Sequence, residues 1–217
     1  MANVVMAVSF LIPILVGGVL WTVAWRRRAA RLFWAWLALG WTLNIAGNIA
    51  WAVHDLLTGN RLPPLSWVDL LYVARYICLA VACWQYPASW EKRRLRQVGT
   101  LVLLIALALW VALYRTEFVT VERSWDQVLG VALYPVLDVG LIYILAFKWR
   151  EMPVEPWRRT LFLLLLGSVA YGIANGINFC VRMASPEGSS AWADVFWLAN
   201  DLFAFVAAIW FMRRTAN

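Results

Sequence analysis

Seven long apolar stretches run through this sequence and limit what it can fold into. Each is long enough, at about 1.5 Å per helical residue, to cross a hydrocarbon layer about 30 Å thick. We predict helices over residues 4–25, 32–54, 67–87, 98–114, 126–147, 160–183 and 193–212. With 64% hydrophobic and 14% charged residues, the chain is too apolar for a soluble domain with one buried core. We therefore expect an all-α, polytopic integral membrane protein: a single helical-bundle domain over residues 1–217, with no soluble domain.

The basic residues cluster in alternate loops and predict the direction of the chain. Fourteen of the nineteen Lys and Arg lie in the loops 26–31, 88–97 and 148–159 and after Met212. Because basic loops stay in the cytoplasm, we expect the N-terminus outside, the C-terminus inside, and anionic lipid headgroups as partners of these loops. No basic residue precedes the first stretch, which argues against a cleavable signal peptide. The net charge of +7 is thereby explained without nucleic acid. The sixteen Trp and seven Tyr are expected mainly at the headgroup level.

Polar residues recur at matched places in two of the stretches. One helical face of 32–54 and its flank carries Asn44, Asn48, Trp51 and Asp55, and the same spacing carries Tyr171, Asn175, Asn178 and Arg182, 127 residues later. The next helices open with Trp67-Val68-Asp69 and, 125 residues later, Trp192-Ala193-Asp194. We infer that the second and third, fourth and fifth, and sixth and seventh helices repeat one hairpin. Carboxylates at helix starts act as caps, a role expected for Asp69, Asp126 and Asp194.

Charged side chains within the stretches mark a candidate site. Arg75, Asp138 and Asp201 lie at comparable depths, roughly 12–18 Å from the outer face. An isolated charge in hydrocarbon is costly, so we expect Arg75 to face Asp201 or Asp138. The predicted ligand-binding or polar-network residues are Asn44, Asn48, Asp69, Arg75, Tyr76, Tyr134, Asp138, Asn175, Asn178 and Asp201. Two interpretations stay open: a network that only holds the helices together, or an outward-opening pocket for a small ligand.

Signals for metals, cofactors and catalysis are weak. His54, the only histidine, is a polar residue at a helix end or a weak candidate to ligate one metal, haem or pigment atom. No cofactor is predicted; bound lipid stays open beside the single pigment or haem at His54. The spacing of Cys78, Cys83 and Cys180 indicates neither a zinc site nor a disulfide framework. No Lys falls within the stretches, which excludes a retinal Schiff base, and no catalytic motif stands out, so we expect no enzyme.

Three short motifs resemble a known family: Leu65-Ser66-Trp67-Val68-Asp69-Leu70-Leu71-Tyr72, Leu133-Tyr134-Pro135-Val136-Leu137-Asp138 and Ala193-Asp194-Val195-Phe196-Trp197-Leu198. They are similar to the multi-helix N-terminal membrane regions of bacterial diguanylate cyclase (GGDEF) signalling proteins, over about half of the chain. The resemblance implies a sensory-input module in the bacterial cytoplasmic membrane. No GGDEF-type catalytic domain or signalling helix follows Met212, so we expect no cyclic dinucleotide synthesis from these residues.

Two classes of function remain. The first is a non-enzymatic sensory-input module that binds a small ligand or a partner through the outer-half polar pocket. The alternative is an accessory subunit of a multi-subunit, energy-transducing membrane complex, favoured by the short loops and the many Trp residues. In either case we expect a protein partner or a homo-oligomer. A small-solute transporter comes third, because the cytoplasmic halves of the stretches carry few polar residues.

Overall fold

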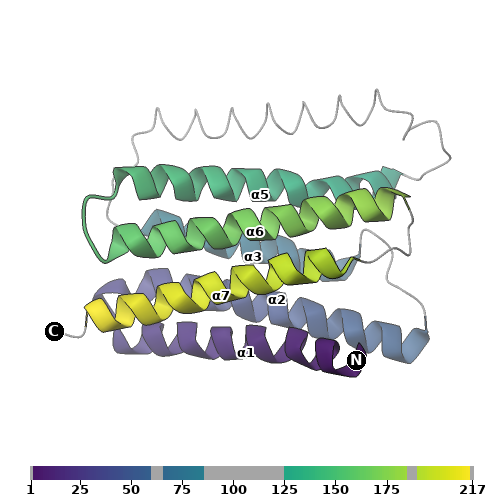
Figure 1. The fold of residues 1–217 in the computed structure, drawn as a ribbon, viewed down its shortest axis with the longest axis horizontal. Helices are drawn as coiled ribbons and strands as arrows, with labels where there is room; N and C mark the ends of the chain where they lie inside the picture. The colour runs from purple at the N-terminus through teal and green to yellow at the C-terminus, as the bar shows by residue number, and fades with distance from the viewer. Residues whose placement is uncertain (1, 60–65, 86–124, 185–189, 216–217) are drawn as a thin grey trace.

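The fold is a bundle of long helices (Figure 1). The computed structural model describes residues 2–59, 66–85, 125–184 and 190–215. The elements are α1 (Ala2–Arg26), the 3-10 helix η1 (Arg28–Ala30), α2 (Arg31–Thr58), α3 (Trp67–Gln85), α5 (Trp125–Glu151), α6 (Trp157–Ala184) and α7 (Ala191–Arg214). Within these ranges the all-α prediction is confirmed. The helix predicted over 98–114, and with it the hairpin of the fourth and fifth helices, lies outside them.

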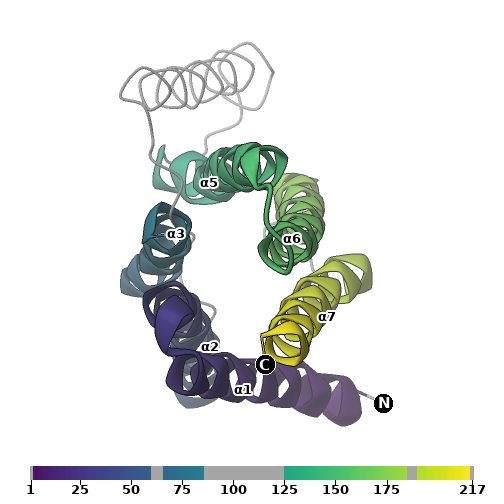
Figure 2. The ribbon, with the colours of Figure 1, turned by 90° about the vertical axis from the view of Figure 1, so that its left-hand side faces the viewer.

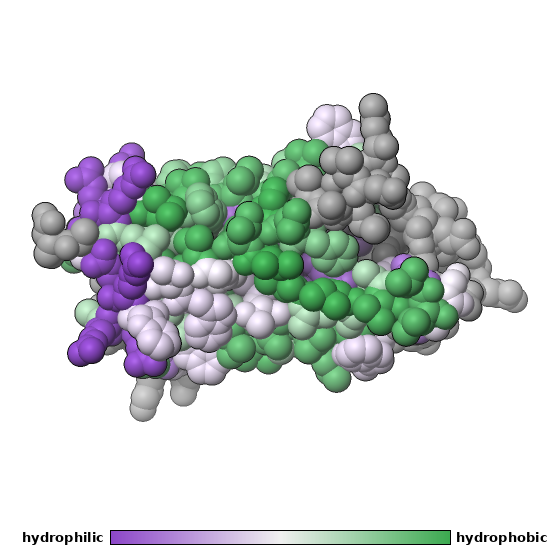
Figure 3. Space-filling view, turned by 90° about the horizontal axis from the view of Figure 1, so that it is seen from below, coloured by the Kyte–Doolittle hydropathy of each residue, from purple (hydrophilic) through white to green (hydrophobic). Residues whose placement is uncertain are grey.

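Several helices are suited to a membrane. In the part of the chain that the structure describes, three are long and apolar enough to cross one: α3, the Trp157–Val181 part of α6, and α7. The pair Phe10–Arg26 and Arg28–Thr58, bent by 113°, passes the same criteria together. Apolar side chains cover much of the body of the molecule, and hydrophilic ones gather at one end (Figure 3). We call this the basic end, because α1, α5 and α7 finish there with Arg26, Lys148, Arg150, Arg213 and Arg214 in their last turns. The chain is a helical membrane protein.

The helices form a closed ring, seen end-on in Figure 2. Each of α1, α2, α3, α5, α6 and α7 packs against the next, and α1 also packs against α7 to complete the circle. Apolar side chains of α1 and α2, including Leu20, Val23 and Trp34, fill the interior and are fully buried. Trp34 meets the ring of Phe211 from α7 at a centroid distance of 5.2 Å. Trp34, three residues after the start of α2, therefore lies near the basic end but packs in the core and does not face lipid.

Arg27 fastens this closure at the basic end. It lies in the break between α1 and η1, and its Nη1 donates to the carbonyl oxygen of Thr215 (2.5 Å). Its Nη2 donates to the carbonyl oxygen of Met212 (2.6 Å). The last carbonyls of a helix lack intrahelical partners and carry partial negative charge, so a guanidinium satisfies both needs. Arg27 thus joins the α1–η1 break to the last turn of α7.

The α2–α3 and α6–α7 hairpins cross at matched glycines. A Cβ added at Gly40 of α2 would lie 3.4 Å from the carbonyl oxygen of Arg75 on α3. A Cβ added at Gly167 of α6 would lie 3.2 Å from the carbonyl oxygen of Asn200 on α7. Gly167 follows Gly40 by 127 residues and Asn200 follows Arg75 by 125, the offsets of the predicted repeat. The same close backbone approach therefore occurs at the same place in each hairpin.

A matched hydrogen bond supports the same repeat. In the first hairpin the hydroxyl of Tyr72 on α3 donates to Oδ1 of Asn48 on α2 (2.8 Å). In the second, the indole N–H of Trp197 on α7 donates to Oδ1 of Asn175 on α6 (3.2 Å). Asn175 and Trp197 stand 127 and 125 residues after their counterparts. These contacts support a duplicated hairpin for α2–α3 and α6–α7.

The two glycines should respond differently to alanine. Alanine favours a helix interior by about 1 kcal/mol over glycine. At Gly40 the new methyl group meets atoms at ordinary contact distance, so we expect Gly40→Ala to keep or raise the melting temperature. At Gly167 it presses on a backbone oxygen that cannot rotate away, so we expect Gly167→Ala to lower it. Thermal unfolding of both purified variants in one detergent tests this. Equal or reversed shifts would contradict the difference in helix approach.

Candidate functional site

Polar side chains from five helices meet inside the ring. The buried ones at this level are Asn44 of α2, Arg75 of α3, Asp138 of α5, Ser168 and Asn175 of α6, and Asn200 and Asp201 of α7. The sequence predicted five of them: Asn44, Arg75, Asp138, Asn175 and Asp201. They face inward because a polar group in contact with hydrocarbon would remain unsatisfied.

Arg75 lies on the inner face of α3, where apolar side chains stand before and after it. Val68 and Leu79 lie on the same face, one or two helical turns away, and are buried. The guanidinium of Arg75 is enclosed by aromatic rings, with its Cζ 3.8 Å from the ring centroid of Tyr171 and 5.3 Å from that of Trp41. Such cation–π contacts stabilise a desolvated cation by about 2 kcal/mol or more. Only 2% of Arg75 is exposed.

Asp138 of α5 is held by neutral donors. The hydroxyl of Tyr76 donates to Oδ1 (2.7 Å), and the amide of Asn175 donates to Oδ2 (2.7 Å). The same amide also reaches the Tyr76 oxygen at 3.2 Å. Three helices, α3, α5 and α6, are therefore linked by one carboxylate and its two donors.

Asp201 of α7 is held in a similar way. The indole N–H of Trp41 on α2 donates to Oδ1 across the interior of the ring (2.9 Å), and the neighbouring Asn200 amide donates to the same oxygen (3.3 Å). Trp41 is 2% exposed and lies ten residues after the start of α2, about 15 Å along the helix, so it departs from the headgroup position expected for Trp. Its N–H provides a donor that a plain hydropathy reading of the sequence hides.

The direct pairing expected for Arg75 requires correction. Its Nε and Nη1 are buried and have no hydrogen-bond partner, so neither nitrogen bonds to Asp138 or Asp201. Both carboxylates still act on Arg75 electrostatically. The aromatic rings occupy the immediate surroundings of the guanidinium, and the neutral donors have taken carboxylate oxygens. Arg75 is thus compensated in charge but retains unused donors.

Equivalent positions of the two hairpins touch at the centre. The hydroxyl of Tyr171 on α6 donates to Oδ1 of Asn44 on α2 at 3.5 Å, and these residues are 127 positions apart. Contact between equivalent residues indicates an approximate two-fold axis along the bundle. The candidate site therefore lies at the junction of the two hairpins.

A second group of predicted residues lies nearer the end opposite the basic end. Tyr134 of α5 donates its hydroxyl hydrogen to Asp69 of α3. Asp69 also accepts from the backbone N–H of Ser66 (2.6 Å), which is the capping role predicted at this helix start. Tyr72 and Asn48 form the bond described above. These residues tie α2, α3 and α5 together beyond the Arg75 level.

Some predicted positions stand apart from the network. Asn178 is half-buried on α6, and His54 is half-buried near the end of α2; neither makes a network contact. Asp194 lies in the first turn of α7, but its side chain makes no capping hydrogen bond to the described residues, whereas the side chain of Asp126 is outside the described part. Where the structure describes the chain, no group of three His, Cys, Asp or Glu is placed to hold a metal. Lys148, assigned to a loop by sequence, belongs to the last turn of α5 and is 2% exposed.

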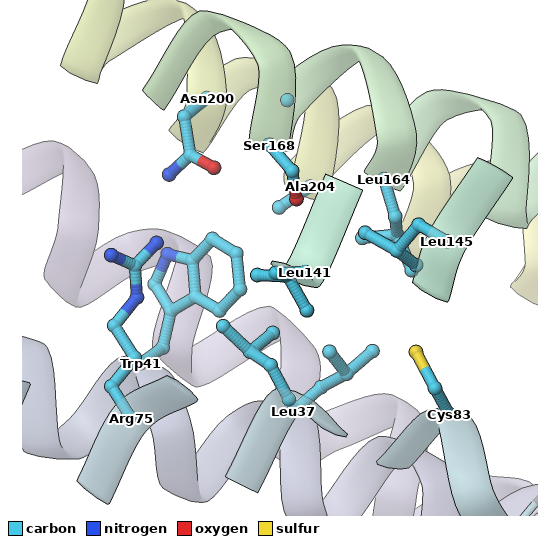
Figure 4. A pocket seen from close by; sticks show the side chains of 12 residues that line it. Leu37, Trp41, Arg75, Cys83, Leu141, Leu145, Leu164, Ser168, Asn200 and Ala204 are labelled. Carbon is cyan, nitrogen blue, oxygen red and sulfur yellow. The ribbon is translucent and has the colours of Figure 1, made fainter. Parts of the chain in front are cut away.

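A small cavity lies beside Arg75. It measures about 10 Å³, enough for a single water-sized group. Residues of α2, α3, α5, α6 and α7 form its wall. Arg75, Trp41 and Asn200 lie toward one side of it, whereas Leu145, Leu164 and Cys83 lie toward the other (Figure 4). Arg75, with its two unpartnered nitrogens, therefore belongs to the wall of a space that is polar on one side and apolar on the other.

The sequence missed four functional neighbours: Trp41, Ser168, Tyr171 and Asn200. All four carried a usable signal. Tyr171 is the repeat counterpart of Asn44, and Asn200 is that of Arg75. Trp41 and Ser168 each stand three positions before Asn44 and Tyr171, which places them on the same helix face as those residues.

No family model, curated protein or solved structure matches this chain. The site is therefore interpreted from its own chemistry.

Two tyrosines on α3 should differ in importance. Tyr76 is buried and bonds both Asp138 and Asn175, whereas Tyr72 is half-buried and donates to the neutral Asn48. We expect Tyr76→Phe to destabilise the protein by about 1–2 kcal/mol, since a buried carboxylate oxygen loses its donor. Tyr72→Phe should cost well under about 1 kcal/mol. Denaturant unfolding in detergent measures both. A larger loss in Tyr72→Phe would show that the outer bond, not the Asp138 group, holds the bundle.

Proposed function

We propose that the chain crosses the cytoplasmic membrane of a bacterium seven times, with the N-terminus outside and the basic end in the cytoplasm. Support comes from the gathering of arginines of α1, α5 and α7 at one end of the molecule. Basic residues at one end of a helical bundle favour that end as the cytoplasmic one. The fourth crossing is the stretch 98–114, which is proposed from the sequence alone, and the bacterial location rests on the family resemblance.

Cysteine labelling tests the direction. In a Cys180→Ser background, Ser190→Cys before α7 should react with a membrane-impermeant maleimide on intact cells. Glu155→Cys, between α5 and α6, should react only after permeabilisation. Each variant is the control for the other, since Cys78 and Cys83 are buried in both. The opposite pattern would reverse the proposed topology.

We further propose a non-enzymatic sensory-input module that binds a small ligand at the junction of the two hairpins. The observation that carries this proposal is the pair of unpartnered nitrogens of Arg75, a residue that lines the cavity. A purely structural arginine would be expected to use its donors, because an unmade hydrogen bond to a buried group costs about 1–3 kcal/mol. A binding site keeps such donors free for its ligand.

The position of the site suits an input role. A ligand beside Arg75 would touch α3 of one hairpin and, through Asn200, α7 of the other. A ligand shifts the balance between two conformations of a protein only if it binds one of them more tightly. A ligand between two packed hairpins meets this condition when the two conformations differ in how the hairpins pack. Asp201, one residue further along α7, would pass the change to Trp41 on α2.

Native mass spectrometry of the protein purified from membranes tests the module. We expect a bound small molecule on the wild type and on Tyr72→Phe, and its loss from Arg75→Gln, because Gln lacks the guanidinium donors. Size-exclusion profiles establish that all three remain folded. A wild-type protein without any small-molecule adduct, or an adduct kept by Arg75→Gln, would contradict ligand binding at Arg75 and favour a role in which the network only holds the helices together.

A further inference from the structure

We infer that the ligand is a neutral, lipid-soluble molecule that presents a hydrogen-bond-accepting oxygen, such as a carbonyl, to Arg75. This inference rests on the proposed ligand-binding function and adds the chemical class of the ligand. Three observations carry it: the free donors of Arg75, the charges around them, and the leucine wall of the cavity.

The free donors determine the head of the ligand. Arginine has five N–H donors and no acceptor, so only an acceptor can satisfy Nε and Nη1. Both atoms are buried, and Arg75 is 2% exposed and lines the cavity. The cavity of about 10 Å³ admits a group no larger than one oxygen atom with its hydrogens. A single acceptor oxygen therefore fits the polar side of this space.

The surrounding charges select a neutral head. Arg75 already has two carboxylates nearby, Asp138 and Asp201, each bonded to neutral donors. An anionic ligand would add a third negative charge to a buried site, which is costly in a medium of low dielectric constant. A cationic ligand would meet the guanidinium directly. A neutral oxygen satisfies the donors without either penalty.

The wall of the cavity indicates the rest of the ligand. Its lining leucines come from four helices: Leu37, Leu79, Leu141, Leu145 and Leu164. Such a surface gains free energy when it covers hydrocarbon and offers no polar partner. Because the cavity is small, the chain of a ligand enters only when these leucines change rotamer or the hairpins separate. Entry of a hydrocarbon chain thus couples binding to a change in helix packing.

Three nine-carbon probes of different head charge test the class: 2-nonanone, nonanoate and nonylamine at neutral pH. Each is titrated into the protein in lipid nanodiscs, and tryptophan fluorescence is followed because Trp41 lines the cavity. Partitioning into lipid is removed by subtracting the Arg75→Gln titration. We expect saturable binding of 2-nonanone at least tenfold tighter than that of the other two probes, retained in Tyr72→Phe.

Two further variants allow the test to be made even if Arg75→Gln does not fold. Arg75→Lys keeps the cation but loses the planar fork of donors, and Ala204→Val narrows the cavity while leaving Arg75 in place. Both should weaken 2-nonanone binding at least fivefold. Unchanged binding in Arg75→Lys and Ala204→Val would overturn the assignment of the probe to this cavity.

The outcomes separate this inference from the proposed function. Tighter Arg75-dependent binding of nonanoate or nonylamine would overturn the neutral class and leave the binding module standing. Absence of binding by all three probes, with a small molecule still found on the purified wild type and lost from Arg75→Gln, would overturn the carbonyl head alone. If no probe binds and no small molecule is found on the purified wild type, the proposed binding module is overturned as well.

Discussion

The positive charge of Arg75 in the middle of an apolar ring is the constraint on which the interior depends. A desolvated guanidinium needs compensation, and here it comes from rings and from carboxylates acting at a distance. The carboxylates, in turn, need donors of their own, which Tyr76, Asn175 and Trp41 provide. Each demand introduces another side chain from another helix. One buried cation thus accounts for polar contacts among α2, α3, α5, α6 and α7.

The duplicated hairpin explains how such a centre can be built from little sequence. The α2–α3 and α6–α7 hairpins pack in the same way, with matched glycines and matched cross-helix hydrogen bonds at equivalent positions. The copies differ where they meet: Arg75 in one corresponds to Asn200 in the other, and Tyr76 to Asp201. The backbone frame is therefore nearly symmetric, whereas the chemistry at its axis is not. The second hairpin has no cation at the position that corresponds to Arg75.

Hydropathy and charge predicted much of the fold, because the membrane penalises polar residues on the outer surface so strongly. Within the described ranges, the helices fall where apolar stretches were predicted, and the charged residues at depth, Arg75, Asp138 and Asp201, do meet. The bonding partners of these charged residues could not be predicted. Trp41 and Tyr171 lie on the predicted polar helix faces, but only packing shows that they provide an N–H donor or a ring to a charge.

The bonds of Arg27 to the last turn of α7 have a mechanical consequence. From Asp201 to Thr215 the helix runs about 21 Å at 1.5 Å per residue. Because the far end of that length is tied to the corner between α1 and α2, α7 resists sliding along its own axis as an independent rod. A displacement of α7 near Asp201 would instead tilt the helix about its bonds to Arg27. Movement at the centre of the ring would then change the tilt of α7, and of α1 with it, at the basic end.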